Sequence, residues 1–278
     1  MSAKLEGEPF KNRLLIAAVF FASSLGGSAY ADGQFVGMTP SFIPSHFGLG
    51  FGSYPEHIGS EKNEIGFAPF GRYSWGKNRY IALEVNYASM NLLEHRNWRF
   101  GPAGMWRFGR KDVDDPVVNE LPDIDGSLEV GFFGAFEQVG EDPRDRWWFG
   151  GNITQGITGD NNGYTITASV RRWMPIGRFS AFGLSLGTTY GSSDYMDTFF
   201  SVDTTGSDAS GLPVFQARSG IRDVRVAAIF MQPVSRKWVI GGGLLYSRLL
   251  EDAANSPIVS QRGDPDQLVF GFGLARGF

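Results

Sequence analysis

Residues Leu268 to Phe278 read LVFGFGLARGF, and this stretch decides the fold class. Leu268, Phe270, Phe272 and Leu274 are large and apolar, whereas the residues that alternate with them up to position 275 are Val, Gly and Ala. Successive side chains of a β-strand point to opposite faces, so a period of two separates a bulky apolar face from a face of small residues. The stretch therefore predicts a strand with two very different faces.

The same alternation recurs upstream, in segments separated by the Gly, Pro, Asn and Asp residues that are typical of turns. We predict strands over roughly 43–54, 64–75, 79–87, 97–108, 125–137, 145–157, 164–174, 179–190, 221–232, 237–249 and 266–278. Bacterial single-chain barrels have an even number of strands. We therefore predict about twelve strands, with ten as the alternative. The twelfth lies in 191–220, where 198–202 and 214–215 are strand-like, or else 79–94 is a broken pair.

Two features favour an all-β transmembrane antiparallel up-and-down β-barrel over a soluble sandwich. The face opposite the bulky residues carries Gly, Ser, Thr and charge, which suits a barrel lumen better than a dry core. The bulky face carries aromatic residues near the strand ends, as in the interfacial girdles of membrane barrels. These residues are Tyr73, Trp75, Trp98, Trp106, Tyr164, Trp238 and Tyr246. Strands in lipid must close on themselves, because unpaired backbone groups are costly there.

Composition excludes several other classes of protein. The chain has 278 residues, of which 42% are hydrophobic, so wholesale disorder is not expected. It has no Cys, which rules out disulfides and thiolate metal sites. Its net charge of −4 gives no global basic field, so we expect no nucleic-acid partner.

Residues 1–31 resemble a secretory signal peptide. Lys11 and Arg13 precede an apolar run from Leu14 to Leu25, which is too short to span a bilayer as a helix. Ala29-Tyr30-Ala31 provides a cleavage site of the A-x-A type. We predict cleavage after Ala31, export from the cytoplasm, and a single barrel domain over 32–278. The long segments 111–125 and 191–220 are expected to form functional loops or caps.

Charged residues recur on the face that should line the lumen. By parity these are Arg72, Glu84, Arg99, Arg107, Glu129, Glu137, Arg171 and Arg225. Opposite signs on neighbouring strands favour cross-strand ion pairs. We expect a charge lattice that fills a narrow lumen, with a small polar channel as the alternative.

The sequence offers little chemistry. His46, His57 and His95 have no metal-ligand spacing, and solvated loop polarity is the expected role of His95. A Ser-His-acid hydrolase in the barrel wall stays possible, although no motif supports it. We therefore predict no enzyme activity, no catalytic residue, no cofactor and no metal site.

Three segments resemble the MipA/OmpV family of outer-membrane proteins, also called MltA-interacting proteins. The segment Arg99 to Arg110 is similar to the family pattern RxGPxxRYRxGR, and Asp194 to Val202 is similar to DYMxTYFGV. The most specific is Tyr246 to Val259, which resembles YxRLLGDAADSPIV but has Glu251 where Gly is usual. Terminal Phe278 agrees with the family, whereas Arg276 replaces an aromatic residue.

The resemblance implies a barrel in the cell outer membrane, in contact with outer-membrane lipid. It further implies a non-enzymatic scaffold that links an MltA-like murein transglycosylase to a bifunctional penicillin-binding protein in envelope maintenance. A narrow solute channel and a surface adhesin or antigen are the alternatives. With Phe278 on the periplasmic side, we expect 191–220 and 250–265 to face the exterior.

Overall fold

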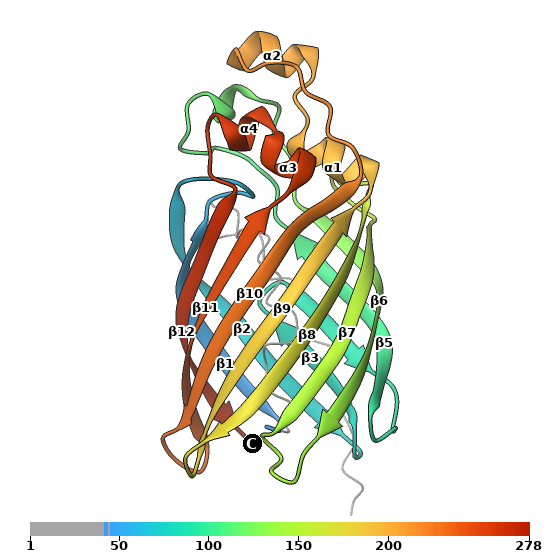
Figure 1. The fold of residues 1–278 in the computed structure, drawn as a ribbon, viewed down its shortest axis with the longest axis vertical. Coiled ribbons are helices and arrows are strands. Elements are labelled where there is room, and N and C mark those ends of the chain that lie inside the picture. The colour runs from blue at the N-terminus through green and yellow to red at the C-terminus, as the bar shows by residue number, and fades with distance from the viewer. Residues whose placement is uncertain (1–41, 44) are drawn as a thin grey trace, which may run out of the picture.

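The computed structural model describes residues 42–43 and 45–278. The predicted signal peptide 1–31 and its cleavage after Ala31 lie outside this range. Twelve antiparallel strands follow one another around a closed barrel, and β1 pairs with β12 to complete the ring (Figure 1). The prediction of a twelve-strand up-and-down barrel is confirmed.

The strand bounds agree closely with the alternation in the sequence. They are β1 His46–Pro55, β2 Asn63–Trp75, β3 Arg79–Glu84, β4 Tyr87–Asn91, β5 Trp98–Arg107, β6 Ser127–Val139, β7 Arg146–Gly156, β8 Tyr164–Ile176, β9 Ser180–Gly191, β10 Gly220–Pro233, β11 Trp238–Leu249 and β12 Asp266–Gly277.

The twelfth strand comes from the broken pair, because 79–94 forms the short hairpin of β3 and β4. The strand expected within 191–220 is wrong. Residues Ser193–Phe200 form helix α1, and only Val202 and Phe215 make an isolated β-bridge. Tyr195, Met196, Phe199 and Phe200 are spaced for one face of a helix, and all four are buried.

The outer surface of the barrel is apolar, with an aromatic girdle near each end. Trp98 begins β5 and is 54% exposed, whereas Trp106 lies near the other end of the same strand and is 38% exposed. They are eight positions apart, which at about 3.4 Å per residue and a tilt near 40° spans roughly 21 Å along the barrel axis. This height is close to the apolar band of outer-membrane barrels, so the barrel spans a membrane with its strands. Among the described residues, no helix is long and apolar enough to cross a membrane.

The two ends of the barrel differ. One end, here called the turn end, has the short connections 76–78, 92–97, 140–145, 177–179 and 234–237, and the chain terminates there at Phe278 (Figure 1). The opposite end carries the cap, which comprises residues 56–62, 108–126, 157–163, 192–219 and 250–265. The cap contains η1 Val118–Glu120, α1, α2 Thr204–Ser210, α3 Glu251–Asn255 and α4 Pro257–Ser260. Segments 191–220 and 250–265 therefore lie at the end opposite Phe278, as predicted.

Candidate functional site

The lumen contains the charged residues predicted from parity. Exposure is at most 6% for Glu84, Arg99, Arg107, Glu129, Glu137, Arg171 and Arg225. Arg72 is half-buried, and its guanidinium carbon lies 3.6 Å from the centre of the Tyr80 ring. The prediction of a charge lattice is confirmed, and the lattice divides into an upper cluster beneath the cap and a lower cluster towards the turn end.

The upper cluster is built around a fully buried ion pair. Arg107 donates from Nε and Nη2 to the two carboxylate oxygens of Glu129, at 2.5 and 2.9 Å. Glu129 also accepts hydrogen bonds from Thr154 Oγ1 and Asn161 Nδ2, both at 2.7 Å. The two parallel hydrogen bonds fix the position of each side chain relative to the other, and the Thr154 and Asn161 donors occupy the remaining acceptor positions of Glu129. Fixed side chains therefore fill this part of the lumen.

Tyr195 connects the cap to the upper cluster. It lies on α1, is fully buried, and accepts hydrogen bonds from the guanidinium groups of Arg107 and Arg222. Both guanidinium carbons also lie close to its ring centre, at 4.9 Å for Arg107 and 5.5 Å for Arg222. One phenol therefore holds two cations in place and fixes the cap helix over the lumen.

Two buried residues of this cluster, Arg222 and Asp223, were not predicted from the sequence. The register of β9 and β10 shifts between Ile221 and Asp223, so that Arg222 and Asp223 are both buried although they are adjacent in sequence. Asp223 pairs with Arg222 at 2.6 Å and with Arg225 at 3.3 Å. A β-bulge places an extra residue on one strand and breaks the parity rule. The adjacent opposite charges at the start of β10 were the only sequence signal for it.

The lower cluster contains a second set of paired charges with aromatic neighbours. Glu137 pairs with Arg99 at 2.7 Å and with Arg146 at 2.9 Å. Arg171 lies over the Trp148 ring, with 4.7 Å from its guanidinium carbon to the ring centre. The free space among these residues is about 50 Å³, so the lattice leaves little room for a solute on this side of the lumen.

The cap has its own hydrophobic core. Its first group contains the four buried residues of α1 together with Leu249, Ala253 and Val259, and a second group joins Val118 and Leu121 to Val202 and Ile258. Polar contacts connect the loops: Arg262 Nη2 donates to Asp115 Oδ2 at 2.7 Å, and Ser256 Oγ donates to the Phe200 carbonyl at 2.7 Å. The cap is thus a packed structure over the mouth of the barrel.

The cap also buries ionisable groups. His57 is 5% exposed, and burial lowers its pKa to about 4, while the hydrogen bond of its Nδ1 with the Ile58 carbonyl opposes that shift in part. Burial likewise lowers the pKa of Arg110 to about 10. His57 is therefore neutral near pH 7, and its protonation would place an unfavourable charge inside the cap.

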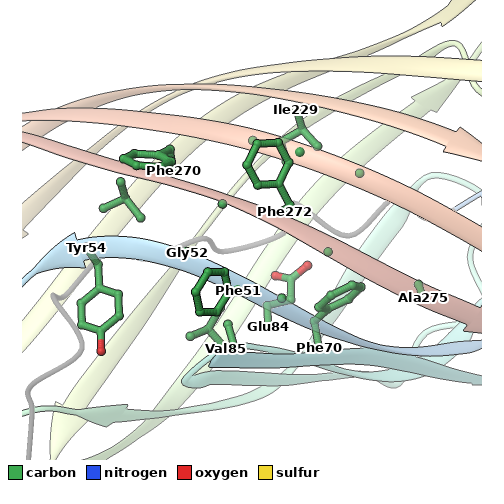
Figure 2. A pocket seen from close by; sticks show the side chains of 18 of the residues that line it. Phe51, Gly52, Tyr54, Phe70, Glu84, Val85, Ile229, Phe270, Phe272 and Ala275 are labelled. Atoms are coloured by element: carbon green, nitrogen blue, oxygen red, sulfur yellow. The ribbon is translucent and has the colours of Figure 1, made fainter. Parts of the chain in front are cut away.

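The opposite side of the lumen is glycine-rich and apolar. A cavity of about 220 Å³ lies against β1, β2, β10, β11 and β12 (Figure 2). Its small lining residues include Gly50, Gly52, Gly66, Gly241, Gly243, Gly271, Gly273, Ala68 and Ala275, and its larger apolar ones include Phe70, Ile229, Met231 and Val269. Glu84 and His46 are the ionisable side chains at its wall besides Tyr54. Larger side chains at these glycine and alanine positions would occupy this space.

The three histidines are scattered. His46 begins β1 inside the lumen, His57 is in the cap, and His95 is exposed at the turn end, where its Nδ1 accepts the backbone N–H groups of Asn97 and Trp98. Within residues 42–43 and 45–278, no group of three His, Asp or Glu side chains is placed to hold a metal ion.

The segments that carry the family resemblance meet at the cap and the upper cluster. Arg99 to Arg110 supplies Arg107, Asp194 to Val202 supplies Tyr195 and the buried face of α1, and Tyr246 to Val259 supplies Leu249, Ala253 and Val259. The latter two segments therefore supply much of the hydrophobic core of the cap.

The comparison with protein families gives a match to the family described as MltA-interacting protein MipA. It covers residues 47–278, which comprise all the barrel strands except His46 at the start of β1. The comparison with curated proteins gives no match.

Comparison with solved structures gives distant barrels. An outer membrane channel from Pseudomonas putida F1 is 9% identical, with a TM-score of 0.49 over 85% of this chain and 96% of that chain. The translocator domain of the autotransporter NalP from Neisseria meningitidis is also 9% identical, with a TM-score of 0.38 over 84% of this chain and 87% of that chain. At such identities and scores, neither likeness informs the function of this chain.

Proposed function

This chain belongs to the MltA-interacting protein MipA family, and on that premise we propose that it is a non-enzymatic scaffold of the outer membrane that holds murein-remodelling enzymes at its turn end. The partners would be an MltA-like transglycosylase and a bifunctional penicillin-binding protein. The observation that carries the proposal is the closed lumen, because a barrel filled and capped in this way offers its surfaces rather than its bore.

Loop length supports the orientation. Membrane barrels of this type have short periplasmic turns and longer extracellular loops. The turn end would then face the periplasm, where murein and its enzymes are located, and the cap would face the exterior.

Charge supports the choice of surface. The five cap segments contain 16 Asp and Glu residues but only 5 Lys and Arg residues. The turn end instead has exposed basic side chains that form no ion pair with the described part of the chain: Lys77, Arg96, Arg178, Arg236, Lys237 and Arg276. Unpaired cations on a rim attract an acidic partner surface and increase its association rate.

A co-purification experiment tests the scaffold. The folded barrel in detergent would be immobilised and exposed to purified transglycosylase and penicillin-binding protein from the same genome. We expect both enzymes to be retained, with retention that falls as salt rises, because exposed charge contacts are screened. Failure of the wild-type barrel to retain the transglycosylase would refute the proposal.

A matched pair of variants locates the contact. Arg178→Glu with Arg236→Glu reverses two charges at the turn end and should reduce retention. Lys111→Glu with Arg218→Glu reverses two charges in the cap and should leave retention unchanged. Equal effects of the two pairs would move the contact away from the turn end.

The narrow solute channel has weaker support. In the part of the chain that the structure describes, buried ion pairs occupy the lumen and packed loops cover its mouth, so we expect well-folded protein to give no current in planar bilayers. A steady current from the wild-type protein would favour the channel over the scaffold.

A further inference from the structure

The lower cluster of the lumen contains more positive than negative side chains. Among the described residues, the charged side chains that line its pocket are Arg72, Arg99, Arg146, Arg171, Glu84 and Glu137. Four guanidinium groups and two carboxylates leave an excess of positive charge. Within a buried pocket such an excess is poorly screened by water, so it favours the uptake of a counter-ion.

Glu137 is engaged on both of its carboxylate oxygens. Its Oε2 accepts from Arg99 Nη2 at 2.7 Å, and its Oε1 accepts from Arg146 Nη1 at 2.9 Å. One carboxylate thus serves two cations. Among the described residues that line the pocket, Glu84 is the only other carboxylate, and it faces a pocket that also contains Arg72 and Arg171.

Arg72 is held in the pocket without a carboxylate partner. Its guanidinium carbon lies 3.6 Å from the centre of the Tyr80 ring, and its Nε donates to Ser74 Oγ at 3.3 Å. It forms no ion pair with any residue that the structure describes. The face of an aromatic ring attracts a cation but does not neutralise it, and a guanidinium group has several N–H donors. Arg72 can therefore donate to a bound anion.

A buried hydroxyl lines the same pocket. Tyr87 begins β4 and is 2% exposed. Its hydroxyl has no hydrogen-bond partner within the described part of the chain. A buried hydroxyl that makes no hydrogen bond is destabilising, and such groups in native proteins are usually satisfied by a water molecule or an ion. Tyr87 is thus a second donor directed at the pocket, on a different strand from Arg72.

The size of the pocket limits what it can hold. Its free volume is about 50 Å³. A cavity holds one water molecule when this volume reaches about 10–15 Å³, so the pocket has room for only a few species of that size. A halide ion is slightly larger than a water molecule and accepts hydrogen bonds without donating any. An ion of this kind meets both the charge and the space of the pocket.

We propose that the lower cluster binds one small inorganic anion of the size of chloride, held by the Arg72 guanidinium group and the Tyr87 hydroxyl. The ion supplies the negative charge that the described lining lacks, and it accepts a hydrogen bond from each donor. Arg72 is half-buried and lies near the end of β2 at Trp75, so the ion reaches the site from the turn end. The bound ion then forms part of the charge lattice that fills the lumen.

Anomalous X-ray diffraction tests the site directly. The folded barrel would be crystallised from sodium bromide, because bromide is close to chloride in size and gives an anomalous signal. We expect an anomalous peak in the lower cluster, in contact with the Arg72 guanidinium group and the Tyr87 hydroxyl. A wild-type crystal with ordered side chains in the lower cluster and no bromide peak there would overturn the proposal.

Thermal unfolding in two salts measures the effect of the ion in solution. Sodium chloride and sodium gluconate would be compared at equal ionic strength, since gluconate is too large for the pocket and general screening is then the same. At about ten times its dissociation constant, chloride should raise the unfolding midpoint by roughly 3–6 °C. Equal midpoints in the two salts at every concentration up to the solubility of gluconate would contradict a bound chloride.

Matched variants locate the chloride effect. Arg72→Gln removes the lumen cation and should abolish most of the chloride-dependent rise in the midpoint. Arg276→Gln removes an exposed cation at the same end of the barrel and should retain the full rise. An equal chloride response in these two variants would place the effect outside the pocket.

Tyr87→Phe provides a test that does not depend on the folding of the Arg72 variant. It keeps the volume of the ring and removes only the hydroxyl. In gluconate it should be at least as stable as wild type, because the lost hydroxyl has no partner among the described residues, whereas in chloride it should be less stable. The same difference from wild type in both salts would overturn the role of Tyr87. Heat-modifiable gel mobility identifies any variant that fails to fold, and none of these outcomes depends on enzyme retention at the turn end.

Discussion

The Arg107–Glu129 pair should contribute more to stability than any exposed pair of the barrel. Glu129→Gln retains the shape of the side chain but leaves the buried Arg107 cation without its counter-ion, and it places an amide among four donors that need acceptors. Removing one partner of a buried pair costs about 3–5 kcal/mol. The free energy of unfolding of a typical domain is about 5–15 kcal/mol, so a loss of this size is a large fraction of it. A loss of ~4 kcal/mol lowers the folded-to-unfolded ratio about a thousandfold.

The measurement is equilibrium unfolding in urea of protein refolded into lipid vesicles, followed by tryptophan fluorescence. Arg107→Met removes the other charge, and the double variant should cost less than the sum of the single variants by about 2 kcal/mol, because the two residues share one interaction. Arg248→Met with Asp266→Asn is the control, since that pair is 51% and 38% exposed and solvent screens it. Two results would refute a stabilising role of the charge lattice. One is a Glu129→Gln variant that is as stable as the exposed-pair control, and the other is a double variant whose loss equals the sum of the two single losses.

Three further predictions concern the closure. Tyr195→Phe retains the ring but removes the hydroxyl that accepts hydrogen bonds from Arg107 and Arg222. It should lower the free energy of unfolding by about 2 kcal/mol and speed proteolysis of the cap. Proteolysis of the cap at the wild-type rate would show that this hydroxyl does not hold the cap in place. Folding lowers the pKa of His57 from 6.5 to about 4, so between these pH values the folded protein binds fewer protons than the unfolded chain. The free energy of unfolding should therefore fall by about 3 kcal/mol as the pH decreases from 6.5 towards 4. In His57→Gln, the free energy of unfolding should change much less between pH 6.5 and pH 4. An unchanged pH profile would show that other groups cause the loss of stability. Ser256→Ala removes a buried hydrogen bond to the Phe200 carbonyl and should cost about 1 kcal/mol, measured by thermal unfolding. The exposed control Ser219→Ala should leave the stability unchanged.

Alternation in the sequence determined most of the barrel. The period of two assigned Phe272 to lipid and Gly273 to the lumen, and it placed Arg107 and Glu129 on one inward face before their pairing was known. This inference works because a strand has only two faces, and the bilayer and the lumen demand opposite side chains.

The same rule failed where the backbone leaves the regular strand. The bulge at Arg222 and Asp223 changes parity within one residue, and Ser193–Phe200 forms a helix although residues 198–202 resemble a strand in the sequence. The break at 79–94 was left open, because five- and six-residue strands carry too few alternations to fix a turn.

The sequence by itself therefore determined the barrel, its lipid-facing residues and the sign of its lumen charges, since each depends on side-chain direction within a single strand. Only the tertiary structure decided that the cap loops pack together over the mouth of the barrel and that Tyr195 accepts hydrogen bonds from two arginines. Those features depend on distances between segments far apart in the chain, and these distances are set by closure of the barrel rather than by any local period.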